Sequence, residues 1–182
     1  SKRLEATSFQ FGEAGQHHRR LWLQADSPIH GEMYRQRCLR EDCVTITLKC
    51  HRGIGPPVKG IALVADDNFS ARYDLDRSKG VFSRPAHKLY GESYQDRVLV
   101  LKTAKGGVAS AWMLREMKHS QITPKAYLFN SVNPILAQGA AFGEISLVDR
   151  FEGGDVTRLI QTGDEIYVDP SAGIVTIMNR SR

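Results

Sequence analysis

Three short apolar runs in the second half of the chain constrain the fold most strongly. They are RVLVLK (97–102), KAYLFN (125–130) and ISLVD (145–149), and each has the length and composition of a buried strand. Two segments with helical spacing separate them, 108–120 and PILAQGAAF (134–142). Strand–helix–strand units require right-handed crossovers, so the pattern predicts parallel central strands with helices packed on the sheet.

Flanking segments add further β structure. CVTITLKC (43–50) alternates β-branched with polar residues, and VKGIALVA (58–65) reads as a second strand. EIYVDPSAGIVTIM (165–178) is typical of a hairpin, and Asp155 is a suitable N-cap for a helix over VTRLIQ (156–161). We expect the first two strands and the hairpin to be antiparallel or barrel-like. The fold class is therefore α/β, with parallel central strands, added antiparallel β structure and a C-terminal hairpin.

The chain divides into two parts that differ in composition and periodicity. Residues 1–42 are polar, rich in Arg, His and Gln, and have no sustained periodicity, whereas 43–182 carries all the clear strand and helix signals. We expect 1–42 to be an N-terminal extension of unknown role and 43–182 to be one α/β domain.

Composition narrows the possible functions. No run approaches the roughly 20 apolar residues of a membrane span, and the first residues lack the apolar core of a secretion signal, so we expect a cytoplasmic protein without a membrane partner. The formal net charge is +5, but the basic residues are scattered among 20 acidic ones. We therefore expect no nucleic-acid partner, and a mildly basic surface suited to anionic metabolites or an acidic subunit.

LVLKTAKGGVASAW (99–112) is the strongest candidate for a binding site. A strand passes through Gly106 and Gly107 into a helix start, where backbone N–H groups and the helix dipole favour an anion. Lys105 adds a positive charge and Ser110 a hydroxyl. Structural alternatives remain open for each: a tight turn for the glycines, a solvated lysine, and a small residue in the first turns of a helix for Ser110.

Other residues receive mostly structural interpretations. We expect His87 to be a hydrogen-bonded structural histidine rather than a general acid. Asn133-Pro134 is expected to fix a turn near the site. Trp112, Met113 and Met117 recur at helical spacing and are expected to lie in the core.

The cysteines and one histidine form a separate cluster in the sequence. Cys38, Cys43 and Cys50 are followed directly by His51. Their spacing matches none of the usual zinc or iron–sulfur patterns, so we expect no metal site in this chain, with metal binding by these four residues as the alternative.

Four stretches of the chain resemble the aconitase X swivel domain family. They are HKLYGESYQDRVLVLKTAKGG (87–107), TPKAYLFNSVNPILAQGA (123–140), RLIQTGDEIYVD (158–169) and AGIVTI (172–177). The resemblance implies a swivelling β/β/α fold and a role as the small subunit of a hydro-lyase that dehydrates a small hydroxy-carboxylate. The family's substrates include cis-3-hydroxy-L-proline and phosphorylated mevalonate. It also implies a large partner subunit that carries an iron or iron–sulfur centre, and no cofactor in this chain.

The resemblance also suggests roles for individual residues. Lys105, Gly106 and Gly107 are expected to bind the substrate's anionic end, with Ser110 as candidate catalytic base. Arg72 falls where relatives place a loop facing the partner, and we expect it to bind a carboxylate; a surface ion pair with neighbouring aspartates is its alternative.

The site loop departs from the family pattern. The family commonly has a serine-rich loop here, whereas this chain keeps only Ser110. The alternative to a catalytic subunit is a non-catalytic module of the same fold that binds a small anion or another protein.

Overall fold

The computed structural model describes residues 45–180, and the structural statements that follow concern this part of the chain. The expected extension 1–42 lies outside the described residues, as do Cys38 and Cys43.

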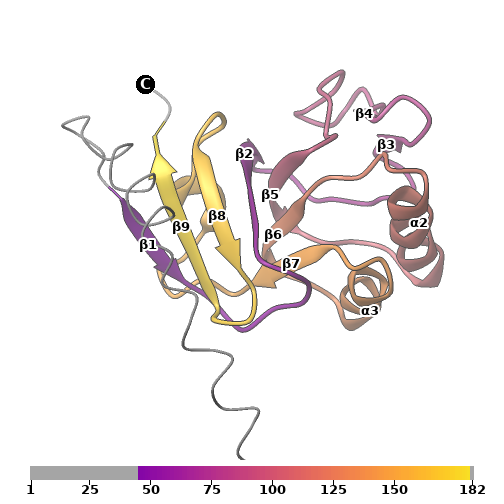
Figure 1. Cartoon of the computed structure of the whole chain (residues 1–182). Coiled ribbons are helices and arrows are strands. Elements are labelled where there is room, and N and C mark those ends of the chain that lie inside the picture. The colour runs from indigo at the N-terminus through magenta and orange to yellow at the C-terminus, as the bar shows by residue number, and fades with distance from the viewer. Residues whose placement is uncertain (1–44, 181–182) are drawn as a thin grey trace, which may run out of the picture. The chain divides into compact units, whose positions relative to one another are not determined.

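A seven-stranded mixed sheet forms the centre of the domain (Figure 1). Its strand order is β1-β9-β8-β2-β5-β6-β7. The strands are β1 (Ile46–Lys49), β2 (Val58–Ala65), β5 (Arg97–Thr103), β6 (Ala126–Ser131), β7 (Ser146–Asp149), β8 (Glu165–Asp169) and β9 (Ile174–Asn179).

Four of these strands are parallel, and for three of them, β5, β6 and β7, the sequence predicts it. β5 pairs with β2 on one side and β6 on the other, so Leu99 lies opposite both Leu63 and Tyr127. β6 pairs in parallel with β7. The crossovers are α2 (Val108–His119) and α3 (Pro134–Phe142), within one residue of the expected helices.

The antiparallel part also follows the expectation, with one correction. β8 and β9 form the predicted hairpin, and β1 pairs antiparallel with β9. β2, however, is not purely antiparallel: Val58–Ile61 pairs antiparallel with β8, while Ile61–Ala65 pairs in parallel with β5. With eight residues, β2 is long enough to join both halves of the sheet.

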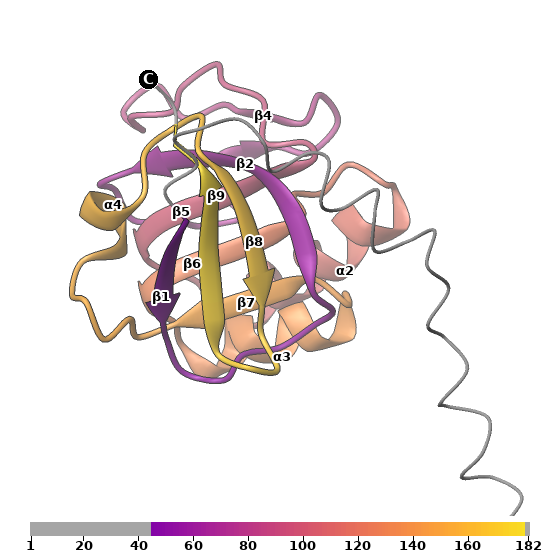
Figure 2. The same ribbon diagram turned by 60° about the vertical axis from the view of Figure 1, so that its left-hand side comes forward.

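Alternating side chains give the domain its three layers. On β5, Leu99 and Leu101 belong to a core beneath α2 and α3, whereas Val98 and Val100 belong to a core shared with β8 and β9. The antiparallel strands lie over one face of the parallel strands and the helices over the other (Figure 2). This is the β/β/α architecture that the resemblance implies.

The remaining elements are short. The loop-rich segment between β2 and β5 holds a two-stranded ribbon, β3 (Leu75–Asp76) and β4 (Val81–Phe82). α4 (Val156–Leu159) is a single turn capped by Asp155, shorter than expected because Ile160 is already extended. Within the described residues, the strand expected over 43–50 is present only as β1. None of the described helices is long and apolar enough to cross a membrane.

The prediction that Trp112 lies in the core is wrong. Its exposed fraction is 61%. The buried stripe of α2 consists of Ser110, Leu114 and Met117, and Trp112 lies about 200° around the helix from Ser110. Met117 is buried and Met113 packs against the core, which confirms those two predictions.

Candidate functional site

The carboxyl ends of the parallel strands meet at one edge of the sheet. The segment after β2 continues beside the end of β5: the Phe69 N–H donates to the Thr103 carbonyl (2.9 Å) and the Lys105 N–H donates to the Phe69 carbonyl (2.7 Å). In open α/β sheets, ligands bind in the crevice outside the carboxyl ends of the strands. The structure therefore places the 105–110 loop where a ligand is expected.

The glycine loop is held by the helix that follows the next strand. The Nδ2 of Asn133 donates to the Gly106 carbonyl (3.2 Å), while its Oδ1 accepts from the Leu136 N–H (2.8 Å) at the start of α3. Gly106 has a φ of +126°, a conformation that side chains disfavour. Asn133 thus fixes a turn next to the loop, as expected, but its amide contact with Gly106 was not predictable, because only the fold brings the two together.

The start of α2 is open to a ligand. Gly107 occupies the N-cap position, and in the described part of the chain no side chain accepts from the first-turn N–H groups. A Cβ on Gly107 would meet nothing within 4 Å. Free N–H groups and the helix dipole favour an anion at such a position, so the geometry leaves the predicted anion site available.

Ser110 lies behind this loop rather than on its surface. Only 2% of the residue is exposed, and its N–H donates to the Gly107 carbonyl (2.9 Å). Its Oγ lies 2.2 Å from the position that a Cβ on Gly106 would take. A substrate therefore reaches this hydroxyl only when the loop shifts.

Lys105 and Arg72 are both exposed near this edge of the sheet. Lys105 forms no ion pair with any described residue, and the Arg72 guanidinium lies 5.4 Å from the ring centre of Tyr73. The predicted roles of these residues, and of Gly106, Gly107 and Ser110, stay predictions.

The alternative for Arg72, an ion pair with Asp66 or Asp67, is wrong. Asp66 instead contacts the Lys102 ammonium (2.5 Å), and Asp67 lies 4.0 Å from the Arg84 guanidinium. The hydrogen bond from Lys102 lowers the pKa of Asp66, and the same bond raises the pKa of Lys102. Asp66 and Asp67 are therefore paired with Lys102 and Arg84 rather than with Arg72.

An apolar surface begins at the loop itself. Val108, Trp112, Ile135 and Phe142 are all exposed, Phe142 by 77%, and they line a groove of about 210 Å³ between α2 and α3. We call these four residues the α2–α3 apolar surface. The Arg115 guanidinium lies over the Trp112 ring at 5.6 Å and gives the surface a basic margin.

His87 is structural, as predicted. It is buried, its Nδ1 accepts from the Leu89 N–H (3.1 Å), and its ring stacks on Phe82 at 4.7 Å between ring centres.

The described residues offer no ligand set for a metal. Burial and the neighbouring Asp149 raise the pKa of the Cys50 thiol to about 11, so it is protonated at neutral pH. His51 is exposed, and no three His, Cys, Asp or Glu side chains come together within 45–180. Because Cys38 and Cys43 lie outside this range, the cysteine-cluster alternative stays untested.

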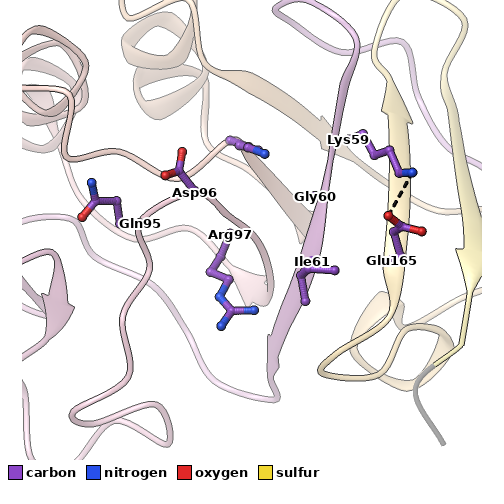
Figure 3. Close-up of a pocket in the computed structure, with 8 residues that line it drawn as sticks. Lys59, Gly60, Ile61, Gln95, Asp96, Arg97 and Glu165 are labelled. Atoms are coloured by element: carbon purple, nitrogen blue, oxygen red, sulfur yellow. Dashed lines mark ion pairs between the residues drawn. The ribbon is translucent and has the colours of Figure 1, made fainter.

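A second depression lies at the opposite edge of the sheet (Figure 3). It is an open pocket of about 570 Å³ at the amino ends of β2 and β5. Lys59 pairs there with Glu165 (2.9 Å), and Arg97 also lines the pocket. Exposed pairs of this kind contribute little energy, and the position is not where open α/β sheets bind ligands.

The three layers, with a glycine loop at the carboxyl edge of the parallel strands, define a swivelling β/β/α domain. The model of the aconitase X swivel domain matches residues 47–177. The chain therefore belongs to the aconitase X swivel domain family.

Similar proteins agree with this assignment. The phosphomevalonate dehydratase small subunit of Methanococcoides burtonii is 31% identical over 137 residues, which are 75% of this chain and 99% of that protein. The protein of the same name from Methanocella arvoryzae is 32% identical over 130 residues, covering 71% and 98%. The crystal structure of Thermococcus kodakaraensis aconitase X in its holo-form matches with a TM-score of 0.68 at 24% identity, covering 74% of this chain and 99% of that one, and shows the same fold. The names of these relatives do not support cis-3-hydroxy-L-proline as substrate.

Proposed function

We propose that this chain is the swivel subunit of an aconitase-X-type hydro-lyase and that it dehydrates a small phosphorylated hydroxy-carboxylate together with a large partner chain. The substrate class rests on relatives named phosphomevalonate dehydratase small subunits. The need for a partner rests on the α2–α3 apolar surface.

That surface is the observation that carries the proposal. Soluble proteins rarely leave large side chains exposed side by side, and such patches usually mark interaction sites. Here Val108 is both the first residue of α2 and part of the apolar surface, so the surface is continuous with the glycine loop. A partner docked on it would also close the loop against its own active site.

The chemistry of dehydration fits the residues of the loop. A base removes the proton next to the carboxylate, the C–H electron pair forms the double bond, and the hydroxyl leaves with the C–O electron pair as hydroxide; release of the proton from the base then completes the loss of one water. Lys105, Arg72 and the N–H groups at the start of α2 bind the anionic groups of the substrate. Ser110 takes the proton, because a helix N-terminus and a nearby cation both stabilise an alkoxide.

Departure of the hydroxyl requires a Lewis acid, which we assign to an iron or iron–sulfur centre on the large partner. In this division of roles, the carboxyl edge of this chain would supply the groups that bind the anion and accept the proton.

A non-catalytic anion-binding module of the same fold is the second candidate. Two observations favour it: Gly107 supplies no hydroxyl at the N-cap, and the hydroxyl of Ser110 is buried.

Affinity capture of the full chain from its own cells, followed by assays of iron and dehydratase activity, tests the proposal. We expect a large iron-containing chain and activity on 5-phosphomevalonate, with cis-3-hydroxy-L-proline as the competing substrate. Activity lost in Ser110→Ala supports the assigned base. Recovery of this chain alone, or of an inactive complex that binds phosphomevalonate, would instead support the binding module.

Two variants of Gly107 test the anion site within the active complex. Gly107→Asn and Gly107→Asp both cap α2, and a side chain at this position meets no neighbour within 4 Å. Only the aspartate adds a negative charge, so we expect KM to rise about tenfold or more in Gly107→Asp, by loss of about 1.4 kcal/mol of binding, and to change little in Gly107→Asn. Equal KM values in the two variants would show that the anionic group of the substrate does not bind at this loop.

A further inference from the structure

We propose that Ser70 is a positioning residue for Ser110: its buried hydroxyl donates a hydrogen bond to the Ser110 oxygen when that oxygen carries negative charge. The proposal deepens the function above and rests on it for its catalytic consequence. The sequence gives no sign of it, since Ser70 and Ser110 are forty residues apart.

The two hydroxyls lie near one unfilled position. A Cβ on Gly106 would lie 2.2 Å from the Oγ of Ser110 and 3.9 Å from the Oγ of Ser70. Both hydroxyls therefore lie within 4 Å of the position that a side chain on Gly106 would begin to fill.

The hydroxyl of Ser70 is buried without a partner. Only 8% of the residue is exposed, and its Oγ has no hydrogen-bond partner in the structure. A buried hydroxyl without a partner destabilises the fold, so alanine would serve a purely structural role better. This position is consistent with a hydroxyl kept for a partner that forms later in the reaction.

Ser70 is also held in place. Its N–H donates to the Oδ2 of Asp74 (2.7 Å), and Asp74 is itself buried, with the Arg84 guanidinium 3.1 Å from its other oxygen. The loop is tied to the same segment through the bond from the Lys105 N–H to the Phe69 carbonyl (2.7 Å). Ser70 and the glycine loop are therefore anchored to one segment, 69–74.

The chemical consequence follows from the charge. The base in dehydration is the deprotonated form of Ser110, and hydrogen bonds to a charged form lower the pKa of the group. Ser70 would act on the reaction through Ser110 without touching the substrate.

The first experiment does not depend on catalysis. The variant Ser110→Cys is labelled with [3-13C]cysteine. Its spectrum has one Cβ resonance that the wild-type spectrum lacks, and the chemical shift of this resonance reports ionisation of the new thiol. We expect its pKa to rise by about half a unit or more when Ser70→Ala is added. Lys105 on the loop and Asp74 and Arg84 beside Ser70 are the charged groups nearby, and they are the same in both variants. An unchanged pKa would overturn the proposal.

The second experiment uses the assembled complex. We expect Ser70→Ala to lower kcat about ten- to hundredfold with KM little changed, while the urea midpoint stays the same or rises. Ser70→Thr, which keeps the hydroxyl, should recover part of kcat. Ser83→Ala is the control, because the Ser83 N–H donates to the backbone carbonyl of Asp74 but the side chain of Ser83 is exposed. If Ser70→Ala is fully active while Ser110→Ala is inactive, the positioning role of Ser70 is wrong and the proposed function is unaffected.

If the wild-type complex is inactive, the proposed function is wrong. The thiol titration would still show whether Ser70 donates a hydrogen bond to residue 110.

Discussion

Ser110 occupies the space that a side chain on Gly106 would need, with its Oγ 2.2 Å from the missing Cβ. The glycine therefore serves two purposes. It adopts a φ of +126°, and it lets a buried hydroxyl lie against the backbone of the loop. The loop and the helix behind it are one packed unit.

Gly106→Ala tests this contact directly. We expect it to reduce the free energy of unfolding by about 2–4 kcal/mol, because the new methyl group meets Ser110 and the backbone is unfavourable for alanine. The measurement is urea unfolding. Gly91→Ala is the matched control: Gly91 also has a positive φ, +84°, but a Cβ there meets nothing within 4 Å, so only the backbone cost of about 1–2 kcal/mol remains. An equal reduction in the free energy of unfolding in the two variants would show that a methyl group on residue 106 does not clash with Ser110.

Trp112 should matter for assembly and not for folding. We expect Trp112→Gln to weaken binding to the large partner about tenfold or more, since exposed tryptophans at interfaces are frequent hot spots. Its free energy of unfolding should change by less than about 1 kcal/mol, because the side chain is 61% exposed. Tyr90→Gln is the control: Tyr90 is 59% exposed but is not part of the α2–α3 apolar surface. The partner's Kd, measured by calorimetry, distinguishes the two. Equal affinity in both variants would place the interface elsewhere.

Cys50 should resist alkylation at neutral pH. Burial and Asp149 raise the pKa of its thiol to about 11, so the reactive thiolate forms only in strongly basic solution. Labelling with iodoacetamide across a pH series, read site by site from peptide masses, should show the rate at Cys50 still rising above pH 10. Rapid labelling at pH 7 would contradict the environment that the structure gives this thiol.

Asp155 should stabilise the domain in a pH-dependent way. Its Oδ1 accepts from the Asn130 amide (2.7 Å) and from the Thr157 N–H (3.1 Å) at the start of α4. The Asn130 bond, followed by those of Thr157, lowers the pKa of Asp155 below its ordinary value. A lowered pKa means that this stabilisation is present above the ordinary value and is lost as the pH falls through the folded-state pKa.

The corresponding variant is Asp155→Ala. We expect it to cost about 1–2 kcal/mol at pH 7, as for other N-caps, with the difference from wild type shrinking in acid. Asp155→Asn keeps an oxygen acceptor but cannot titrate, so it should retain part of the stability without the pH dependence. Urea unfolding at pH 7 and pH 3 measures both effects. A difference from wild type that is constant over this range would exclude the assigned role of the carboxylate.

The sequence alone was sufficient for the order and type of the main elements. RVLVLK, KAYLFN and ISLVD, with helices between them, require parallel strands, because the crossovers have one allowed hand. The terminal hairpin was equally clear from its turn, 169–173. Local signals carry this information, since strand and helix patterns depend on neighbours in the chain.

Tertiary structure decided everything that depends on residues distant in sequence. β2 joins both halves of the sheet because β8 returns to its first residues. Trp112 is exposed because α2 and α3 meet at Ala111 and Gly139, which leaves Trp112 in the open groove beside that contact. The glycine loop could be predicted as a candidate anion site from its own residues. Its contact with Asn133, and the place of Ser70 near Gly106, arise only when the strand ends converge at one edge of the sheet, and no local pattern encodes that meeting.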